Sequence, residues 1–218
     1  DEEEYTVEAN AKRTHRALLV ANKTFRNWGA SYSTLQYRFS GDINKVAATL
    51  KKVKGPSGGA WKVTKKVDVD EWSLEAAIKK AYKGTKKSDV SLFMISTHGD
   101  DSADGELIMA YTGYRYRNYI TFTELATWLK KYCKGKIIVL IQSCGAGSSI
   151  ANAMSGDEKA YVLNGDDEGD LANELTAAEG AEANGQLIQN WPEEESSFNA
   201  ERFVQKAIDA FKALAEKK

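Results

Sequence analysis

The chain has 218 residues, of which 42% are hydrophobic and 28% are charged, and this composition suits a globular protein with one large domain. Its formal net charge of −1 gives no reason to expect nucleic acid or an anionic membrane as a partner. No apolar run approaches the roughly 18 residues that a membrane-spanning helix needs, so a membrane span is not expected.

The first predicted elements are a strand and a helix. Residues 16–22, with the sequence RALLVAN, read as a buried strand behind a polar lead-in. His15 belongs to that lead-in, and we expect its side chain to be exposed to solvent. Asp42 is placed to cap the helix that follows, because apolar residues recur at helical spacing from Ile43 onward.

A break, an edge strand and a second helix come next. The glycine-rich residues 55–59 interrupt the chain. Residues 61–69 then alternate between apolar and polar side chains, which predicts a strand with one wet face near a sheet edge. Ser73 precedes a helix whose apolar residues begin at Leu74.

The middle of the chain predicts a small hairpin and a third helix. The hairpin is expected from residues 106–110 and 116–122. Thr121 or Thr123 is the expected start of the helix, and Gly135 is its expected stop.

Two continuously apolar runs flank that hairpin and helix. Residues 91–99 read SLFMISTHG and present His98, and residues 136–147 read KIIVLIQSCGAG and present Cys144. Such runs are typical of buried strands in a parallel sheet. The order β-α-β-α-β-α-β therefore predicts an α/β fold, a three-layer sandwich with a mainly parallel central sheet and helices on both faces.

After Ile150 the composition changes. Residues 157–195 hold twelve acidic residues and one basic residue, Lys159, and no further strand is expected. We interpret this stretch as a solvated surface linker rather than as a regulatory segment over the cleft. The expected organisation is a lead-in at 1–15, a core at 16–156, an acidic linker at 157–198 and a C-terminal helix at 199–218.

His98 and Cys144 carry the chemical prediction. In open α/β sheets, ligands and chemistry gather at the carboxyl ends of the strands, so the two side chains are expected to meet there. The glycines after Cys144 allow a tight turn that exposes a thiol, which makes a nucleophile with an acid/base partner. Cys133 has no such surroundings and is expected to be structural, and the two cysteines do not predict a disulfide framework.

These two motifs resemble those of the caspase-like cysteine peptidases, the clan that includes legumains, gingipains, clostripain-type enzymes and metacaspases. STHGD around His98 is similar to the His-Gly motif of the family, and IQSCGAG around Cys144 is similar to its nucleophile motif. The caspase signature Q-A-C-[RQG]-G lies about 50 residues after its histidine, and here the separation is 46 residues. The resemblance covers about residues 16–149.

The resemblance implies a cysteine endopeptidase. In that reading Cys144 attacks the scissile carbonyl, and His98 protonates the leaving amine and then activates water. The backbone N–H groups of Gly99 and Cys144 form the oxyanion hole. No third member of a triad is implied.

The resemblance also places residues in the pocket for the P1 side chain of the substrate. Gln142, two residues before the nucleophile, is typical of caspases, which prefer acidic P1 residues. Arg38 lies close to where caspases place an arginine for P1 aspartate, whereas Asp42 would suit a basic side chain. Acidic and basic P1 residues therefore stay open, with asparagine as a third choice.

The partners implied are a protein or peptide substrate and a second chain. The clan needs about two strands after the nucleophile, so the sequence suggests the N-terminal large chain of a processed enzyme whose small chain follows Lys218. The habits of the clan imply a secreted or cell-surface location and a bacterial source. No cofactor is expected, and for calcium the only candidates are Asp100, Asp101 and Asp104.

Two other classes of function remain open at this point. One is a catalytically silent module that keeps the fold for interactions. The other is a different thiol enzyme, an amidase or an acyltransferase, on a similar sheet. Retention of both His98 and Cys144 favours an enzyme over the silent module.

Overall fold

The computed structural model describes most of the central part of the chain. The described residues are 14–25, 36–87, 89–100, 106–110, 119–142 and 160–164, with Gln205, Ile208 and Asp209. For residues 36–38, 100, 142 and 160–164, only the backbone is described.

A five-stranded parallel sheet forms the middle layer, with the strand order β2-β1-β3-β7-β8. Its strands are β1 (His15–Ala21), β2 (Trp61–Val67), β3 (Val90–Ser96), β7 (Lys136–Gln142) and β8 (Ala160–Asn164). All seven residues of β3 are buried, as its apolar run predicts. β2 is an edge strand with several exposed residues, which confirms the predicted wet face.

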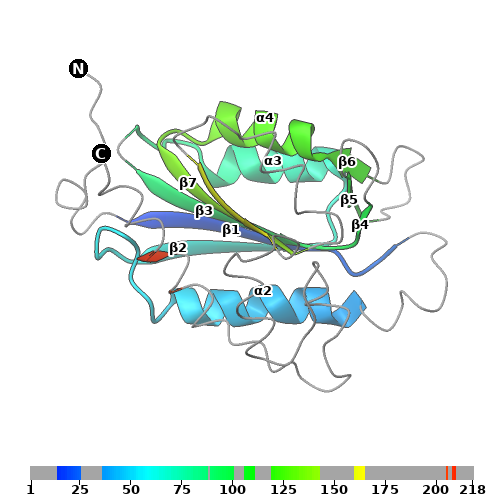
Figure 1. The fold of residues 1–218 in the computed structure, drawn as a ribbon, viewed down its shortest axis with the longest axis horizontal. Coiled ribbons are helices and arrows are strands. Elements are labelled where there is room, and N and C mark those ends of the chain that lie inside the picture. Colours follow the sequence, from blue (N-terminus) through cyan, green and yellow to red (C-terminus); the bar gives the residue numbers. More distant parts are fainter. Residues whose placement is uncertain are drawn as a thin grey trace.

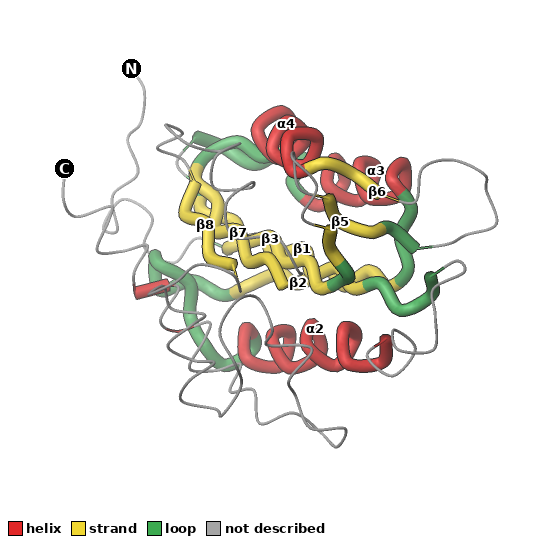
Figure 2. The backbone as a smooth tube through the Cα atoms, turned by 45° about the vertical axis from the view of Figure 1, so that its right-hand side comes forward, coloured by secondary structure: helices red, strands yellow, loops and turns green. Residues whose placement is uncertain are grey.

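Helices cover both faces of this sheet (Figure 1). Helix α2 (Gln36–Leu50) lies on one face, and α3 (Glu71–Ala81) and α4 (Phe122–Tyr132) lie on the other, as the turned view in Figure 2 also shows. Buried residues of α3 and α4 share one core cluster with alternate residues of the strands, among them Phe93 and Val139. The predicted three-layer α/β sandwich is confirmed.

A small antiparallel sheet extends from the end of β3. It consists of β4 (Gly99–Asp100), β5 (Glu106–Ile108) and β6 (Tyr119–Thr121), in that order. The predicted hairpin is therefore confirmed, and β4 adds a strand that begins directly after His98.

Of the three predicted helix starts that lie within the described residues, two are wrong. Helix α2 begins at Gln36, six residues before the predicted cap Asp42, because Phe39 lies four residues before Ile43 and extends the same buried face. Helix α3 begins at Glu71, and its cap is Asp70 rather than Ser73.

The helix α4 start is confirmed. The Thr121 hydroxyl accepts a hydrogen bond from the Glu124 N–H at 3.1 Å, which caps the helix. Gly135 follows the helix with a φ of 80°, and a Cβ there would collide with the carbonyl oxygens of Lys86 and Asp89. Glycine is therefore required at this stop.

His15 corrects another prediction, because it is not an exposed residue of the lead-in. It is the first residue of β1 and is only 2% exposed. Its Nδ1 donates to the Val90 carbonyl at 2.9 Å, and its Nε2 accepts from the Ser57 hydroxyl at 2.5 Å. These two partners satisfy both ring nitrogens in the core. The Trp61 ring packs beside the imidazole, with the two ring centroids 5.0 Å apart.

Strand β8 is a further difference from the sequence prediction, which expects no strand after Ile150. Its five residues, AYVLN, pair with β7 in parallel inside the predicted linker 157–198. The run is short and acidic residues flank it, so the overall composition of this stretch does not indicate a strand. The segment boundaries at 15, 156 and 198 stay predictions.

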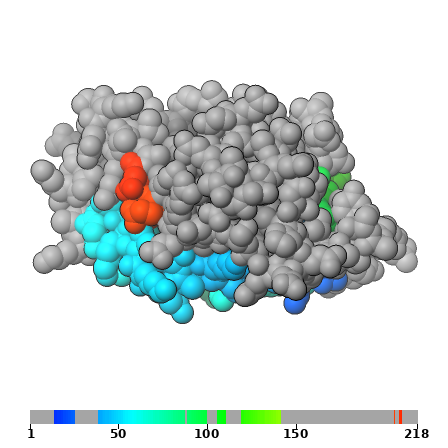
Figure 3. Space-filling model, turned by 60° about the horizontal axis from the view of Figure 1, so that its bottom comes forward, coloured from blue at the N-terminus to red at the C-terminus, as the bar shows by residue number. Residues whose placement is uncertain are grey.

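The described residues near the C-terminus are helical. Ile208 is fully buried, which agrees with its place on the predicted apolar face. Figure 3 shows these residues in orange and red beside the cyan segment that joins α2 to β2.

Candidate functional site

Three neighbouring strands end in one row at the carboxyl edge of the sheet. Ala21 of β1 pairs with Ser96 of β3, and Ser96 pairs in turn with Gln142 of β7. His98 follows Ser96 by two residues, and Cys144 follows Gln142 by two residues. The two motif-bearing segments therefore leave adjacent parallel strands at the same level. Cys144 itself lies outside the described residues.

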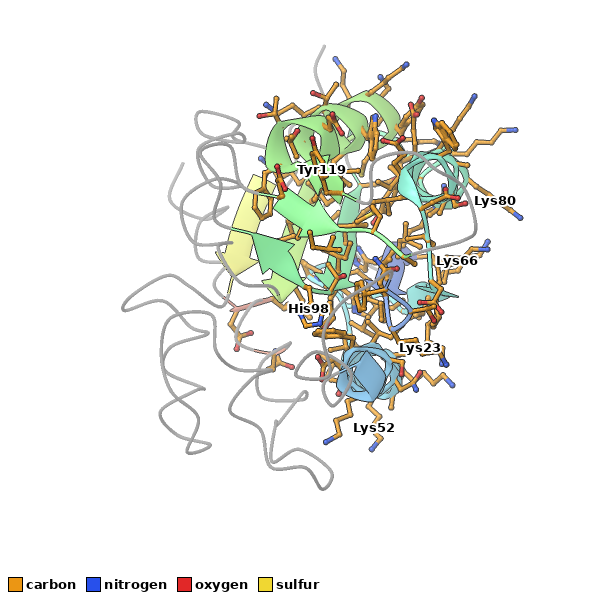
Figure 4. All side chains as sticks on the ribbon, turned by 90° about the vertical axis from the view of Figure 1, so that its right-hand side faces the viewer. Lys23, Lys52, Lys66, Lys80, His98 and Tyr119 are labelled. Carbon is orange, nitrogen blue, oxygen red and sulfur yellow. The ribbon has the colours of Figure 1, made fainter. Side chains whose placement is uncertain are left out.

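His98 lies in the two-residue link between β3 and β4. Its side chain is 3% exposed, and its carbonyl accepts a hydrogen bond from the Ile108 N–H at 2.9 Å. Figure 4 looks toward this edge of the molecule and shows His98 between the small sheet and helix α2. The backbone of His98 is thus held by the small sheet, and the imidazole points toward the α2 side.

Asn22 holds this edge together from the end of β1. Its Nδ2 donates to the Ile108 carbonyl at 3.2 Å and to the Thr97 hydroxyl at 3.4 Å, and its Oδ1 accepts from the Val69 N–H at 2.9 Å. The Thr97 hydroxyl donates to the Ile108 carbonyl at 2.7 Å. Asn22 is fully buried, so these bonds satisfy its amide and also fix the residue before His98.

Asp42 reaches the same edge from helix α2. Its carboxylate accepts a hydrogen bond from the Ser96 hydroxyl at 2.8 Å, and the two residues are 1% and 0% exposed. This contact joins α2 to the end of β3 and favours a structural role for Asp42. A buried carboxylate needs such donors, because burial without them is costly.

The other predicted site residues are placed only by their backbone. Arg38 lies in the first turn of α2, Gln142 is the last residue of β7, and Gly99 is the first residue of β4 and pairs with Leu107. Their roles toward a substrate stay predictions.

Sequence reasoning missed four residues around His98. They are Asn22, Phe25, Phe39 and Ser96. Asn22 carried the same signal as His98, a polar residue at the end of a buried apolar run. The rings of both phenylalanines contact the His98 ring. Neither residue was singled out from the sequence, because nothing in their spacing points to a histidine.

No metal or membrane feature stands out in the described parts of the chain. No group of three or more His, Cys, Asp or Glu side chains is placed there to hold a metal, and Asp101 and Asp104 lie outside those parts. Among the described helices, none has the length and apolar character to cross a membrane. Cys133 is buried at the C-cap of α4 and packs in the core, which agrees with its predicted structural role.

Comparison with known proteins gives similarities of structure. No protein-family model and no curated protein matches the sequence. A structure described as pro-sf-caspase-1 is similar with a TM-score of 0.44 and 15% identity, over 65% of this chain and 55% of that one. Caspase-1 from Spodoptera frugiperda is similar with a TM-score of 0.42 and 17% identity, over 61% of this chain and 48% of that one. The chain therefore spans about half the length of these two caspase structures.

Proposed function

We propose that this chain is the catalytic part of a cysteine endopeptidase in which Cys144 is the nucleophile and His98 is the acid/base residue. The observation that carries the proposal is the pairing of Ser96 with Gln142 across two adjacent parallel strands. Because both strands run the same way and end at the same level, we expect the two residues that each lie two positions later, His98 and Cys144, to meet at the carboxyl edge of the sheet.

The proposed reaction is acyl transfer to a thiol. The Cys144 thiol passes its proton to His98 and its sulfur attacks the scissile carbonyl, and the C–N bond breaks as His98 donates that proton to the leaving amine. A water molecule, deprotonated by His98, then hydrolyses the thioester and releases the carboxylic acid. The N–H groups of Gly99 and Cys144 stabilise the oxyanion in both steps.

For substrate selection, we propose that Arg38 and Gln142 line the P1 pocket. Arg38 belongs to the first turn of α2, one residue before Phe39, which contacts His98. Asp42 is a weaker candidate, because its carboxylate is already engaged by Ser96 in a buried position. This balance favours an acidic P1 residue over a basic one.

A second chain is part of the proposal. β8 is the last strand of the sheet over the described residues, so its outer edge is where strands of a C-terminal small chain would add. Intact-mass analysis of purified native enzyme tests this. A fully active species without any partner chain would contradict it.

The catalytic assignment is tested with an electrophilic peptide that labels reactive thiols. The chain has two cysteines, so the Cys133→Ala variant leaves Cys144 as its single thiol and serves as the matched control. We expect Cys133→Ala to be labelled like the wild type and Cys144→Ala to remain unlabelled. His98→Ala should slow hydrolysis of fluorogenic peptides by about 100-fold or more.

The outcomes separate the alternatives. Labelling of Cys144 without turnover of any P1-scanning peptide library would favour the silent module. Turnover of small amides or acyl donors alone would favour an amidase or an acyltransferase. Activity that survives in Cys144→Ala would refute the proposed nucleophile.

A further inference from the structure

Two phenylalanine rings enclose the His98 imidazole. The Phe25 ring comes from the segment after β1 and lies 4.8 Å from the His98 ring centroid, tilted by 59°. The Phe39 ring comes from the first turn of α2 and lies 4.9 Å away at 86°, an edge-to-face contact. The two phenylalanines also contact each other, at 6.2 Å and 81°. The three rings form a closed group, here called the His98 aromatic group.

The geometry of this group restricts rotation of the imidazole. Tilted and edge-to-face arrangements at such distances are the favoured ones for aromatic pairs. Phe39 and His98 are 1% and 3% exposed, so the ring has little free space into which to turn. The Phe25 and Phe39 contacts come from different elements, so a rotation of His98 must break packing with both.

The backbone of His98 is fixed independently. The Ile108 N–H donates to its carbonyl, and the Thr97 hydroxyl donates to the Ile108 carbonyl. The small sheet therefore sets where the imidazole is attached, while the phenylalanines set how the ring is turned. An acid/base residue needs both, because a small misplacement of a catalytic group lowers the rate steeply.

We propose that Phe25 and Phe39 are positioning residues that hold the His98 imidazole in the orientation in which it serves the Cys144 thiol. The inference rests on the proposed peptidase function for its purpose, but the orientation itself is measurable without any activity.

Nuclear magnetic resonance of histidine-labelled protein tests the orientation. The chain has two histidines, so the spectrum holds two imidazole sets, and the His98→Ala variant assigns them. We expect ring currents to shift the His98 signals in the wild type. In Phe25→Leu and Phe39→Leu these signals should move toward those of a free imidazole, while the His15 signals stay in place.

Phe93→Leu is the matched control for lost core volume. Phe93 is fully buried in β3 and packs in the cluster with α3 and α4, on the other face of the sheet. We expect it to destabilise the fold without moving the His98 signals. Equal His98 shifts in Phe93→Leu and Phe39→Leu would overturn the proposal, as would unchanged His98 signals in both Phe25→Leu and Phe39→Leu.

Kinetics give the second readout. Phe25→Leu should lower kcat for a fluorogenic peptide by about 10-fold or more with little change in KM, because substrate binding is left intact. Phe25→Tyr should restore kcat, since it keeps the ring and Phe25 is only partly buried. A rise in KM alone would contradict positioning. A wild type without activity, but with the expected His98 shifts, would refute the peptidase function and leave the ring orientation standing.

Discussion

The Ser96 hydroxyl donates a hydrogen bond to the Asp42 carboxylate at 2.8 Å, across a separation of 54 residues in the sequence. Both residues are buried, so this bond connects helix α2 to the end of β3, two residues before His98. The helix that carries Phe39 and Arg38 is thus attached at the strand end that leads to His98.

Removal of the Ser96 hydroxyl should weaken the fold measurably. We expect Ser96→Ala to lower the free energy of unfolding by roughly 1.5–3 kcal/mol, because it deprives a buried charged group of a donor. Ser91→Ala is a matched control in the same strand, since the buried Ser91 hydroxyl makes no hydrogen bond in the described structure. Urea unfolding measures both variants, and equal losses would contradict a specific Ser96–Asp42 contribution.

Asn22→Asp tests the hydrogen bonds that hold the segment before His98. A carboxylate keeps the acceptor for the Val69 N–H but cannot donate to the Ile108 carbonyl. The free energy of unfolding should therefore fall by about 3 kcal/mol. We also expect kcat to fall more than KM rises. Asn44→Asp is the exposed control, where the side chain accepts from Lys65, and its effect should stay within about 0.5 kcal/mol. A comparable loss in Asn44→Asp would count against the role of Asn22.

His15 should make stability depend on pH. Burial lowers the pKa of His15 below its ordinary value of 6.5, although the hydrogen bond to the Val90 carbonyl and the Asp89 charge oppose this. As the pH decreases, His15 is therefore protonated at a higher pH in the unfolded chain than in the folded one. The free energy of unfolding falls as the pH decreases from 6.5 toward the lower pKa of the folded state. Above pH 6.5 this contribution is fully present.

The comparison that isolates His15 uses His15→Gln. Urea midpoints at pH 7.5 and pH 5.5 should differ less in this variant than in the wild type, since glutamine does not titrate. The variant is expected to be less stable at both pH values because it loses a buried contact. An identical pH dependence in both proteins would show that the His15 pKa does not change on folding.

Gly135→Ala should be more harmful than Gly58→Ala. Both glycines have a φ of 80°, so alanine is strained at either position by about 1–2 kcal/mol. A Cβ at Gly58 meets no atom within 4 Å, whereas a Cβ at Gly135 collides with two backbone carbonyl oxygens. The difference in unfolding free energy between the variants measures the collision, and no difference would contradict the close approach.

The periodicity of apolar residues predicted much of this architecture. The continuous runs at 91–96 and 136–142 are buried parallel strands, because only a sheet covered on both faces accepts apolar residues at every position. Thr121 was one of two predicted starts for α4, and the hydrogen bond from the Glu124 N–H to its hydroxyl shows that it is the cap. The same local logic misplaced the start of α2, where the six earlier residues carry little apolar signal besides Phe39.

The sequence by itself determined the order of strands and helices along the chain apart from β4 and β8, the apolar faces, and the two motifs that follow β3 and β7. Only the tertiary structure decided which polar groups satisfy one another. His15 forms a hydrogen bond with Val90 at a separation of 75 residues, and Asn22 forms one with Thr97 at the same separation. Such pairs depend on how distant strands and loops come together, and a buried polar residue and an exposed one look alike in a local pattern. For the same reason, only the fold placed two phenylalanine rings against His98.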